Sequence, residues 1–433
     1  MKHQFGVGIM GLGTVGLGTA TILEKNRKIL SMRKKGDIAV VRVLEKRVED
    51  AKKDVAALGL NENIVTDDFD EFLATEGMDI VVEVIGGTTL AKEFILKAIE
   101  AGKSVVTANK DLMAIYGKDL LDAAEEHKVD LRFEASVAGG IPIINVLKND
   151  LIGNNVDRIM GIVNGTTNYI LTRMYEENGD FNEILKEAQE LGYAEADPTA
   201  DVGGFDAARK VAILASIAYN SRVTLDDVYV EGIEKITSHD IDAARQLGYT
   251  IKLLGIAREE DGEIEARVHP VMIPNKHPLA AVGDTFNAVF VDGDAVGETM
   301  FYGRGAGDLP TGSAVVSDIC GVVDDIKYGD LGNQGCTCYL KKPIRAQENF
   351  TSKFYIRMTV QDSPGVLSLI TKILGDHGVS IASVMQYRGN HQDAELIIIT
   401  HSVKEGQFLL AEEDFKKSSF VHGIDNIIRV EEN

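Results

Sequence analysis

The residues FGVGIMGLGTVG at positions 5–16 decide how the N-terminal part of the chain folds. Their first half is apolar enough for a buried strand, and residues 14–33 have the spacing of a helix. Gly11, Gly13 and Gly16 lie between the two as G-x-G-x-x-G. In a dinucleotide-binding turn, the first glycine permits the bend, the second lets the backbone approach a pyrophosphate, and the third lets helix and strand pack closely. A purely structural turn is the alternative, but the position between strand and helix favours a dinucleotide, with its phosphates at the helix N-terminus.

Strands and helices alternate over the following residues. The runs 38–44, 78–85 and 104–107 are apolar and rich in β-branched residues, which is typical of strands buried on both faces, and residues 90–101 have a helical pattern. Such alternation indicates right-handed βαβ units and a parallel sheet. The predicted fold class is therefore α/β, with a Rossmann-type dinucleotide-binding domain in residues 1–135.

The regular alternation of predicted strands and helices ends after about residue 145. Helical patterns at 182–191 and 205–219, mixed with strand-like runs, predict a central α+β domain for substrate binding and dimerisation over residues 136–340. Residues 341–352 are polar and without period, and we interpret them as a linker. Residues 353–433 then give the order βαββαβ, which is the ferredoxin-like pattern. The expected strands are 266–272, 288–291, 298–301, 354–360, 379–387, 394–401 and 426–430, and the last two helices are 366–377 and 405–417.

Charge and cysteine content exclude several classes of protein. A net charge of -22 over 433 residues argues against binding to nucleic acid or to an anionic membrane, which both attract basic surfaces. No secretory pattern opens the chain, and no apolar run is long enough to span a bilayer. The three cysteines, Cys320, Cys336 and Cys338, lack zinc-site spacing and are expected to be free thiols. We therefore expect a cytoplasmic protein.

The end of the second strand bears on which nicotinamide cofactor is bound. An acidic residue there holds the ribose hydroxyls of NAD, and Glu45 is the candidate. Lys46 and Arg47 follow it and could instead bind the extra phosphate of NADP. A solvated run of charges is the third interpretation. The sequence leaves this choice open, with a preference for NADP.

Asp206 and Lys210 are four residues apart on the predicted helix 205–219. An exposed ion pair is the ordinary interpretation of this spacing. However, the same helical row continues into Ile213 and Ile217, so both charges point toward the buried side. Because burial lowers the proton affinity of a lysine, Lys210 is a candidate for proton transfer to and from an alcohol.

Further charged residues lie where ligands bind in doubly wound folds. Lys110 comes just past the strand 104–107, at the carboxyl edge of the sheet, although most lysines in such loops are simply exposed. Glu195 and Asp197 lie in a loop before the helix of Lys210 and could hold an ammonium group. Loop carboxylates are usually solvated, so both interpretations stay open.

Five motifs together resemble the signatures of homoserine dehydrogenases. The longest is LGYAEADPTADVGGFDAARK at 191–210. The others are TANK at 107–110, FEASV at 133–137, GIVNGTTN at 161–168 and YGRGAG at 302–307. They cover nearly the whole chain in order, and the segment from about residue 354 resembles an ACT domain, a regulatory module for small ligands. The segment VRVLEKR at 41–47 departs from the family's usual pattern, which keeps the choice of NAD or NADP in doubt.

The resemblance implies roles for individual residues. Lys210 would be the acid–base group, and Asp206 would position it and the substrate. Glu195 would bind the substrate's amino group, while Asp201 and Lys110 would also contact the substrate. The implied cofactor contacts are Gly11, Gly13, Thr14, Val15, Gly16, Lys46, Arg47, Thr88, Lys110 and Gly303, and the implied ligands of a monovalent cation (Na⁺ or K⁺), largely through backbone carbonyls, are Glu134, Val137, Gly139 and Ile141.

The implied reaction is the reversible NAD(P)-dependent interconversion of L-homoserine and L-aspartate 4-semialdehyde in threonine, methionine and isoleucine biosynthesis. The resemblance further implies a homo-oligomer, a dimer or a tetramer. L-threonine is the expected effector, bound at the helix start after residues 362–365 of the ACT-like segment. Two rivals remain: an acylating semialdehyde dehydrogenase, which needs a cysteine nucleophile that the chain does not display, and a non-catalytic sensor of dinucleotide and amino acid.

Overall fold

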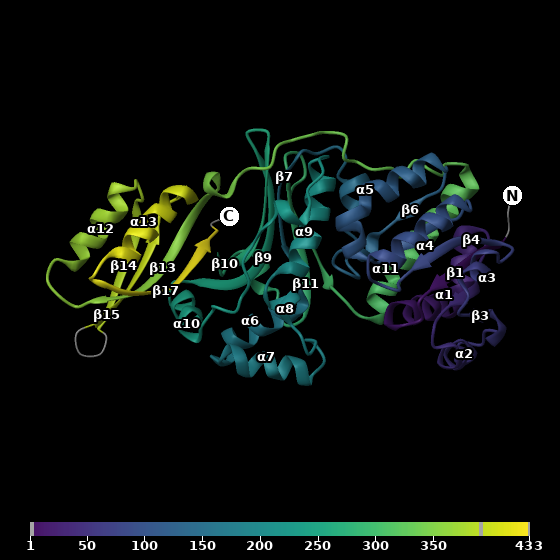
Figure 1. Ribbon diagram of the computed structural model, residues 1–433, viewed down its shortest axis with the longest axis horizontal. Coiled ribbons are helices and arrows are strands. Elements are labelled where there is room, and N and C mark those ends of the chain that lie inside the picture. The colour runs from purple at the N-terminus through teal and green to yellow at the C-terminus, as the bar shows by residue number, and fades with distance from the viewer. Residues whose placement is uncertain (1–3, 389–392, 432–433) are drawn as a thin grey trace. The chain divides into compact units, whose positions relative to one another are not determined.

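The chain folds into two compact units, and the structure, a computed structural model, describes residues 4–388 and 393–431 (Figure 1). The first unit contains Met1–Ile159, Ala212–Leu225 and Asn287–Lys341. The second contains Met160–Val211, Asp226–Phe286 and Lys342–Asn433. Both units are therefore assembled from segments that are far apart in the sequence.

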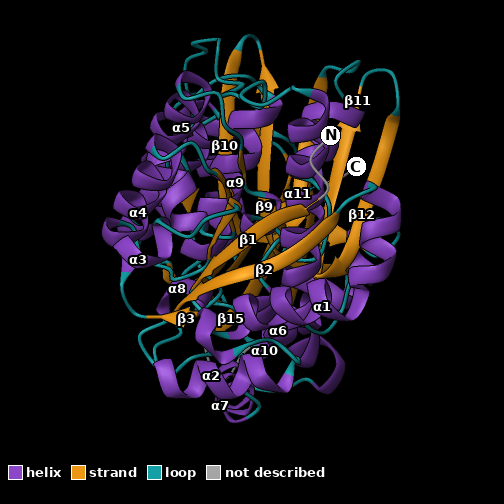
Figure 2. Cartoon of the chain, turned by 90° about the vertical axis from the view of Figure 1, so that its right-hand side faces the viewer, coloured by secondary structure: helices purple, strands orange, loops and turns teal. Residues whose placement is uncertain are grey.

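A six-stranded parallel sheet forms the centre of the first unit, in the order β3-β2-β1-β4-β5-β6. This confirms the predicted α/β class and Rossmann-type topology. Figure 2 shows β1 and β2 side by side, as their parallel register requires. The strands are β1 Gln4–Met10, β2 Asp37–Leu44, β3 Val65–Thr66, β4 Met78–Glu83, β5 Ser104–Thr107 and β6 Leu131–Arg132, and the helices between them are α1 Thr14–Lys34, α2 Val48–Ala57, α3 Phe69–Leu73, α4 Thr89–Glu100 and α5 Lys110–Glu126.

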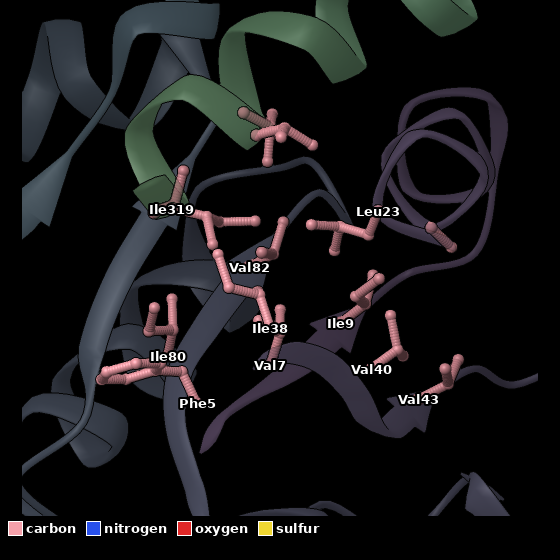
Figure 3. Close-up of a cluster of buried hydrophobic side chains, with 14 of the residues drawn as sticks. Phe5, Val7, Ile9, Leu23, Ile38, Val40, Val43, Ile80, Val82 and Ile319 are labelled. Atoms are coloured by element: carbon pink, nitrogen blue, oxygen red, sulfur yellow. The ribbon is translucent and has the colours of Figure 1, made fainter. Parts of the chain in front are cut away.

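Helix α11, Asp308–Tyr328, completes the core of this sheet from a distant part of the chain. Figure 3 shows Ile319 of α11 and Leu23 of α1 above the apolar side chains of the central strands. The two helices touch closely, because a Cβ on Gly18 would lie 2.3 Å from the carbonyl oxygen of Asp308. This helix was not predicted from the sequence. It shows that the dinucleotide-binding fold recruits residues far beyond position 135, although the three predicted domain boundaries stay a prediction.

A second, mixed sheet organises the other unit, with neighbouring strands in the order β7-β9-β10-β17-β13-β15-β14. Its central part contains β7 Val156–Ile162, β8 Tyr229–Val230, β9 Tyr249–Glu260 and β10 Glu263–Pro274. The helices of this part are α6 Gly165–Glu177, α7 Phe181–Glu190, α8 Thr199–Val202, α9 Phe205–Ala218 and α10 Ser238–Gln246. Strands β11 Phe286–Gly293 and β12 Gly297–Arg304 belong, apart from Phe286, to the first unit; they are neighbours, and β12 is an edge strand.

The last segment has the predicted βαββαβ order. Its strands follow one another in the sheet as β17-β13-β15-β14, and α12 and α13 lie together on one face of them (Figure 1). The predicted helix 405–417 has the observed bounds, whereas the last strand begins five residues earlier than predicted. The elements are β13 Thr351–Gln361, α12 Val366–Asp376, β14 Ile381–Arg388, β15 Asp393–Thr400, β16 Val403–Lys404, α13 Glu405–Lys417 and β17 Val421–Val430.

The predicted linker at 341–352 is hydrogen-bonded in its middle to the start of β10. The N–H of Ile264 donates to the carbonyl of Pro343 at 2.9 Å, and the N–H of Arg345 donates to the carbonyl of Ile264 at 2.8 Å. The Arg345 side chain is buried and donates to Glu260. The segment therefore pairs with the start of β10, because its backbone groups find partners there that a polarity pattern does not reveal.

Candidate active site

A cavity of about 430 Å³ lies at the carboxyl edge of the parallel sheet. Residues from the glycine turn, the end of β2 and the start of α4 line it together. Five residues predicted to contact the cofactor or to choose between NAD and NADP are among them: Gly11, Gly13, Glu45, Lys46 and Arg47. The other lining residues are Leu44, Asp67, Phe69, Val84, Ile85, Gly86, Leu90 and Phe94. This is the edge at which open α/β sheets bind ligands.

The three glycines fit a dinucleotide in the way the motif predicts. Gly11 has φ +94, and a Cβ there would lie 2.9 Å from the Val84 carbonyl oxygen. A Cβ on Gly16 would lie only 2.0 Å from the Gly11 carbonyl oxygen, so this position needs glycine for packing. Gly13 instead has nothing within 4 Å of an added Cβ. The turn is therefore closed behind the first and third glycines and open at the second, where a pyrophosphate would approach the backbone.

Glu45 holds the glycine turn from the end of β2. Its Oε2 accepts the backbone N–H of Leu12 at 2.9 Å, and its Oε1 accepts that of Arg47 at 3.2 Å. Burial alone would raise the pKa of Glu45, but these N–H donors and the Arg47 guanidinium hold it below its ordinary value. Lys46 and Arg47 have exposed side chains at the rim of the cavity. The carboxylate is thus already engaged, and Arg47 Nε lies 3.8 Å from its Oε1 in an exposed pair next to Lys46.

Glu83, at the end of β4, is a buried carboxylate that the sequence analysis missed. Its Oε1 accepts the N–H groups of Ile85 at 3.0 Å and Gly86 at 3.2 Å, and its Oε2 accepts the Thr107 hydroxyl at 2.6 Å. Burial raises the pKa of Glu83 despite these bonds. The residue joins two loops at the ligand edge of the sheet, the turn before Thr88 and the turn before Lys110. Its signal in the sequence is an acidic residue that ends an otherwise apolar strand.

Thr88 and Lys110 begin neighbouring helices at this edge. Thr88 precedes α4, and Lys110 is the first residue of α5. Asn109 connects the two turns, because its side chain donates to the Gly87 carbonyl at 2.7 Å and accepts the Leu112 N–H at 3.1 Å. Both predicted residues are therefore placed at helix N-termini on the ligand edge of the first unit.

In the second unit, Asp206 and Lys210 form the predicted buried pair on α9. Lys210 Nζ donates to Asp206 Oδ2 at 2.7 Å and to the Val163 carbonyl at 2.7 Å. The two side chains are only 12% and 9% exposed, so the prediction that they face the buried side is confirmed. The ammonium group is held in one position by an acid and by the carbonyl of the residue that follows β7.

Asn164 extends this pair into a chain of four side chains, and the sequence analysis did not single it out. Its Nδ2 donates to Asp206 Oδ2 at 2.9 Å and to Asp201 Oδ1 at 2.7 Å, while its Oδ1 accepts the Thr167 N–H at 2.9 Å. The amide therefore caps α6 and separates two carboxylates. Burial, followed by the charge of Asp206, raises the pKa of Asp201.

Comparison with known proteins identifies the family. Residues 11–134 match the homoserine dehydrogenase NAD binding domain, residues 142–320 match homoserine dehydrogenase, and residues 354–419 match the ACT domain. The chain is 42% identical to the homoserine dehydrogenase of Bacillus subtilis over 429 residues, which are 99% of this chain and 98% of that protein. It belongs to the homoserine dehydrogenase family.

Solved homoserine dehydrogenases agree with this assignment. The crystal structure from Thiobacillus denitrificans has a TM-score of 0.93 at 40% identity, covering 100% of both chains. A hyperthermophilic archaeal homoserine dehydrogenase in complex with NADPH has a TM-score of 0.63 at 27% identity, covering 74% of this chain and 98% of that one. The chain is therefore an NAD(P)-dependent oxidoreductase with a C-terminal ACT domain. Both rival functions, the acylating dehydrogenase and the non-catalytic sensor, are set aside.

Two loop carboxylates of the homoserine dehydrogenase motif are not part of the Lys210 chain, the hydrogen-bonded side chains of Lys210, Asp206, Asn164 and Asp201. Glu195 is exposed between α7 and α8, with its carbonyl accepting the Gln189 side chain at 3.1 Å. Asp197 accepts the N–H of Thr199 at 3.1 Å and its hydroxyl at 2.6 Å, and these hydrogen bonds lower the pKa of Asp197. Asp197 thus fixes the start of α8, while the Glu195 carboxylate faces solvent.

The loop with the four predicted cation ligands packs against the Gly303 segment of homoserine dehydrogenase. The Glu134 carboxylate accepts the N–H groups of three successive residues, 143–145, at 2.6–2.8 Å. Gly139 has φ +52, and a Cβ on it would lie 2.3 Å from the Gly305 carbonyl oxygen. A Cβ on Gly303 itself would lie 3.2 Å from Ile141. The Glu134 carboxylate is therefore already hydrogen-bonded to backbone N–H groups. A cation in this loop would have to be bound by backbone carbonyls instead.

Two kinds of feature are absent from residues 4–388 and 393–431. No group of three or more His, Cys, Asp or Glu side chains that could hold a metal ion occurs there. Within the same residues, no helix combines the length and the apolar character needed to cross a membrane.

Proposed function

We propose that Lys210 is the acid–base group of the homoserine dehydrogenase reaction, with Asp206 and Asn164 holding it in place. The observation that carries the proposal is the fixed position of its Nζ, 2.7 Å from both the Val163 carbonyl and Asp206. These bonds use two of the three donors of an ammonium group and leave the third for a substrate oxygen.

The chemistry follows from that position. When bound, the nicotinamide supplies the hydride to the aldehyde carbon of aspartate semialdehyde or takes it from homoserine. In reduction, Lys210 donates a proton from Nζ to the oxygen that becomes the alcohol. In oxidation, it takes the hydroxyl proton back. Asp206 stabilises the protonated, positively charged form of Lys210, which loses its proton in reduction and regains it in oxidation.

Glu195, Asp201 and Lys110 are proposed to bind the substrate. The exposed Glu195 carboxylate is suited to the ammonium group shared by homoserine and aspartate semialdehyde. The Asn164 side-chain amide donates to both Asp201 and Asp206. A substrate bound to Asp201 would therefore be connected to the acid–base group through hydrogen bonds. Lys110 is the first residue of α5, where the helix N-terminus adds to its positive charge.

We further propose NADP as the preferred cofactor. Glu45 is occupied by backbone N–H groups, whereas the exposed Lys46 and Arg47 can bind an extra phosphate. Apolar side chains such as Leu90 and Phe94 line the same cavity and suit an adenine ring. The archaeal relative solved with NADPH supports this choice. The contacts implied for Thr14, Val15, Thr88 and Gly303 belong to the same proposal.

A monovalent cation, Na⁺ or K⁺, is proposed at the backbone carbonyls of Glu134, Val137, Gly139 and Ile141. Support comes from the loop itself, where Ala138 and Gly139 have φ of 54° and 52° in succession. Two left-handed residues in a row reverse the chain and let carbonyls converge. Oxygen ligands alone suit such a hard cation. The measurement is activity in salts of Na⁺, K⁺ and a bulky organic cation at equal ionic strength, and equal rates in all three would refute the proposal.

The ACT domain is proposed to bind an amino-acid effector, L-threonine, at the start of α12. Gly365 precedes this helix with φ +95, and the first N–H groups of a helix are suited to a carboxylate. Homo-oligomer formation is part of this proposal, since such sites commonly lie where two ACT domains meet. The edge strand β12, with Met300 and Tyr302 exposed, provides a further surface for a second copy.

A route from the ACT domain to the catalytic chain supports regulation. Arg429 on β17 donates to both oxygens of Glu405 at 2.6 and 2.7 Å and to Glu231 at 3.1 Å. Glu231 directly follows β8, and the N–H of Ile233 donates to the Val202 carbonyl at 2.8 Å. Val202 is the neighbour of Asp201 in α8. One ion pair and one short segment thus join the ACT domain to the turn that carries Asp201.

The test of the acid–base proposal is Lys210→Ala, with Lys186→Ala, a surface lysine on α7, as the matched control. We expect kcat to fall by about 10²–10⁴-fold, the usual contribution of general acid–base catalysis, while the Kd for the cofactor barely changes. Small primary amines added to the solution should restore part of kcat in Lys210→Ala alone. Near-full kcat in this variant would remove Lys210 from the role.

The test of regulation is truncation after Lys341, assayed with and without millimolar threonine. We expect the intact enzyme to be inhibited and the truncated one to be active and indifferent. The truncation also removes Ser352, Glu405 and Glu431, all partners of the fully buried Arg267. Thermal melting therefore checks whether the truncated protein folds. If it does not, calorimetry measures whether the intact enzyme binds threonine. Insensitivity of the intact enzyme together with no threonine binding would overturn the proposal.

A further inference from the structure

Residues 334–340, which we call the strap, follow α11 in the first unit and carry two cysteines. The carbonyls of Gln334 and Gly335 accept long hydrogen bonds from Lys148 at 3.4 and 3.5 Å. The N–H of Leu340 donates to the Asn220 carbonyl at 2.8 Å, just past the end of α9. The strap therefore fastens the C-terminal end of the helix whose N-terminal half carries Asp206 and Lys210.

Cys336 and Cys338 face each other within this strap. The Cys338 backbone N–H points at Cys336 Sγ at 3.4 Å, so the turn between the two residues brings them together. Cys338 Sγ also lies 3.8 Å from the carbonyl oxygen of Ser216 on α9. Both cysteines are half-buried and line one small cavity with Gly117 and Ser216. Cys338 thus touches α9, while α5 lines the same cavity, and both cysteines are partly exposed.

The surrounding charges distinguish the two thiols. Lys118, Lys148 and Arg222 line the same cavity, and Asp122 opposes them through its ion pair with Lys118. The Cys338 side chain beside it outweighs burial and lowers the pKa of Cys336 to about 6. Closeness to Cys336, together with burial, raises the pKa of Cys338. Cys336 therefore has the more acidic thiol of the two, which is the order expected of a reactive and a resolving cysteine.

We propose that Cys336 and Cys338 form a redox-active dithiol that hydroperoxides oxidise to an intramolecular disulfide, loosening the end of α9. In the first step, the Cys336 thiolate attacks one oxygen of hydrogen peroxide, the O–O bond breaks, and a sulfenic acid and hydroxide form. In the second, the Cys338 sulfur attacks the Cys336 sulfur. The S–O bond breaks, and the hydroxyl leaves as water with the Cys338 proton. Both sulfurs are oxidised, and the peroxide is reduced to water.

The consequence for the enzyme follows from what the disulfide replaces. Oxidation removes the Cys338 S–H, which donates to the Ser216 carbonyl with 3.8 Å between sulfur and oxygen. Ser216 also accepts the Val223 N–H and donates to the Ala212 carbonyl, so the last turn of α9 depends on this contact region. Because α9 is one continuous helix, displacement of its end reaches Lys210. We expect kcat to fall several-fold on oxidation.

The test uses the full-length enzyme treated with stoichiometric hydrogen peroxide. Peptide mass mapping is expected to show loss of two hydrogen atoms in the peptide with Cys336 and Cys338, reversed by dithiothreitol. Cys320, buried on α11, serves as the internal control. In Cys338→Ser, dimedone should trap a sulfenic acid at Cys336, whereas Cys336→Ser should resist. The kcat of the wild type should fall and recover with dithiothreitol, while the kcat of Cys336→Ser stays constant.

Several outcomes overturn the proposal. Oxidation of Cys320 at the same rate as Cys336 would show that the strap is not selective. A disulfide between two chains on a non-reducing gel, or sulfinic acid at Cys336 in the wild type, would exclude Cys338 as the resolving thiol. Disulfide formation with unchanged kcat would refute the effect on α9. The thiol readouts do not involve Lys210, so they stand apart from the acid–base proposal.

Discussion

The cofactor cavity and the Lys210 chain are built in opposite ways. The cavity depends on the backbone: Gly11 and Gly16 are needed because no Cβ fits there, and Gly13 leaves space for a ligand. The Lys210 chain depends on side chains, with Asn164, Asp201 and Asp206 coming from three separate segments. A site formed by the backbone can be recognised in the sequence as a short local motif. A network of side chains forms only when distant segments meet in the fold. The two should therefore fail differently under mutation.

The largest expected effect, after the loss of Lys210 itself, comes from Asn164→Ala. This change leaves Asp201 and Asp206 without their shared donor and frees Asp206 from one of its bonds. Because a hydrogen bond to a charged group contributes about 1.5–3 kcal/mol, we expect kcat to fall roughly 10–100-fold. Cofactor affinity should be unchanged, and the pH–rate profile should shift, which a purely structural role would not produce. Steady-state kinetics over a pH series decide this, and an unshifted profile would assign Asn164 to helix capping alone.

The glycine turn should separate stability from binding. Gly16→Ala places a Cβ 2.0 Å from the Gly11 carbonyl, and overpacking of this kind costs about 1–3 kcal/mol. We expect a lower Tm for Gly16→Ala. Gly13→Ala has free space in the apoprotein, so its Tm should match the wild type while its Kd for the cofactor rises about 10-fold, equivalent to ~1.4 kcal/mol. Thermal melting and fluorescence titration check both. Equal loss of Tm in the two variants would contradict the open position of Gly13.

A smaller effect is expected at the rim of the cofactor cavity. If Lys46 and Arg47 bind the phosphate of NADP, the wild type should prefer NADPH, and Lys46→Ala/Arg47→Ala should lose about 10-fold in kcat/KM with NADPH, or ~1.4 kcal/mol. Its kcat/KM with NADH should barely change, since the lost contacts lie outside the shared part of the cofactor. The measurement is kcat/KM with both cofactors for both proteins. A strong preference of the wild type for NADH would defeat the proposal.

The smallest effect is expected in the link to the ACT domain. Glu231→Gln removes the charge that Arg429 Nη1 contacts at 3.1 Å but keeps the shape of the side chain. Since Glu231 lies outside the catalytic chain, kcat without threonine should stay near that of the wild type. Inhibition by threonine should weaken about 5-fold, at the low end of typical coupling energies. By linkage, the effect of substrate on threonine binding should weaken equally. Unchanged inhibition would place the coupling elsewhere.

Features that depend on one short segment of the sequence were predicted, and features that depend on distant segments were missed. The parallel sheet, the glycine turn and helix 405–417 were predicted because their periodicity and spacing lie within short segments. The pairing of Asp206 with Lys210 was predicted for the same reason, as four residues on a helix share a face. Helix α11, the paired segment 343–345, Glu83 and Asn164 were missed, because each owes its role to a partner between 24 and 290 positions away.

The sequence by itself determined the α/β fold, the family, the dinucleotide turn and the lysine on a buried helical face. These follow from hydrophobic periodicity, glycine conformation and a motif long enough to be specific. Only the tertiary structure decided that Glu45 is bound to the glycine turn, that Asn164 separates two carboxylates, and that Arg429 and Glu231 connect the ACT domain to α8. The physical reason is that a buried polar group must find its partner wherever the fold brings one, and the sequence does not record that distance.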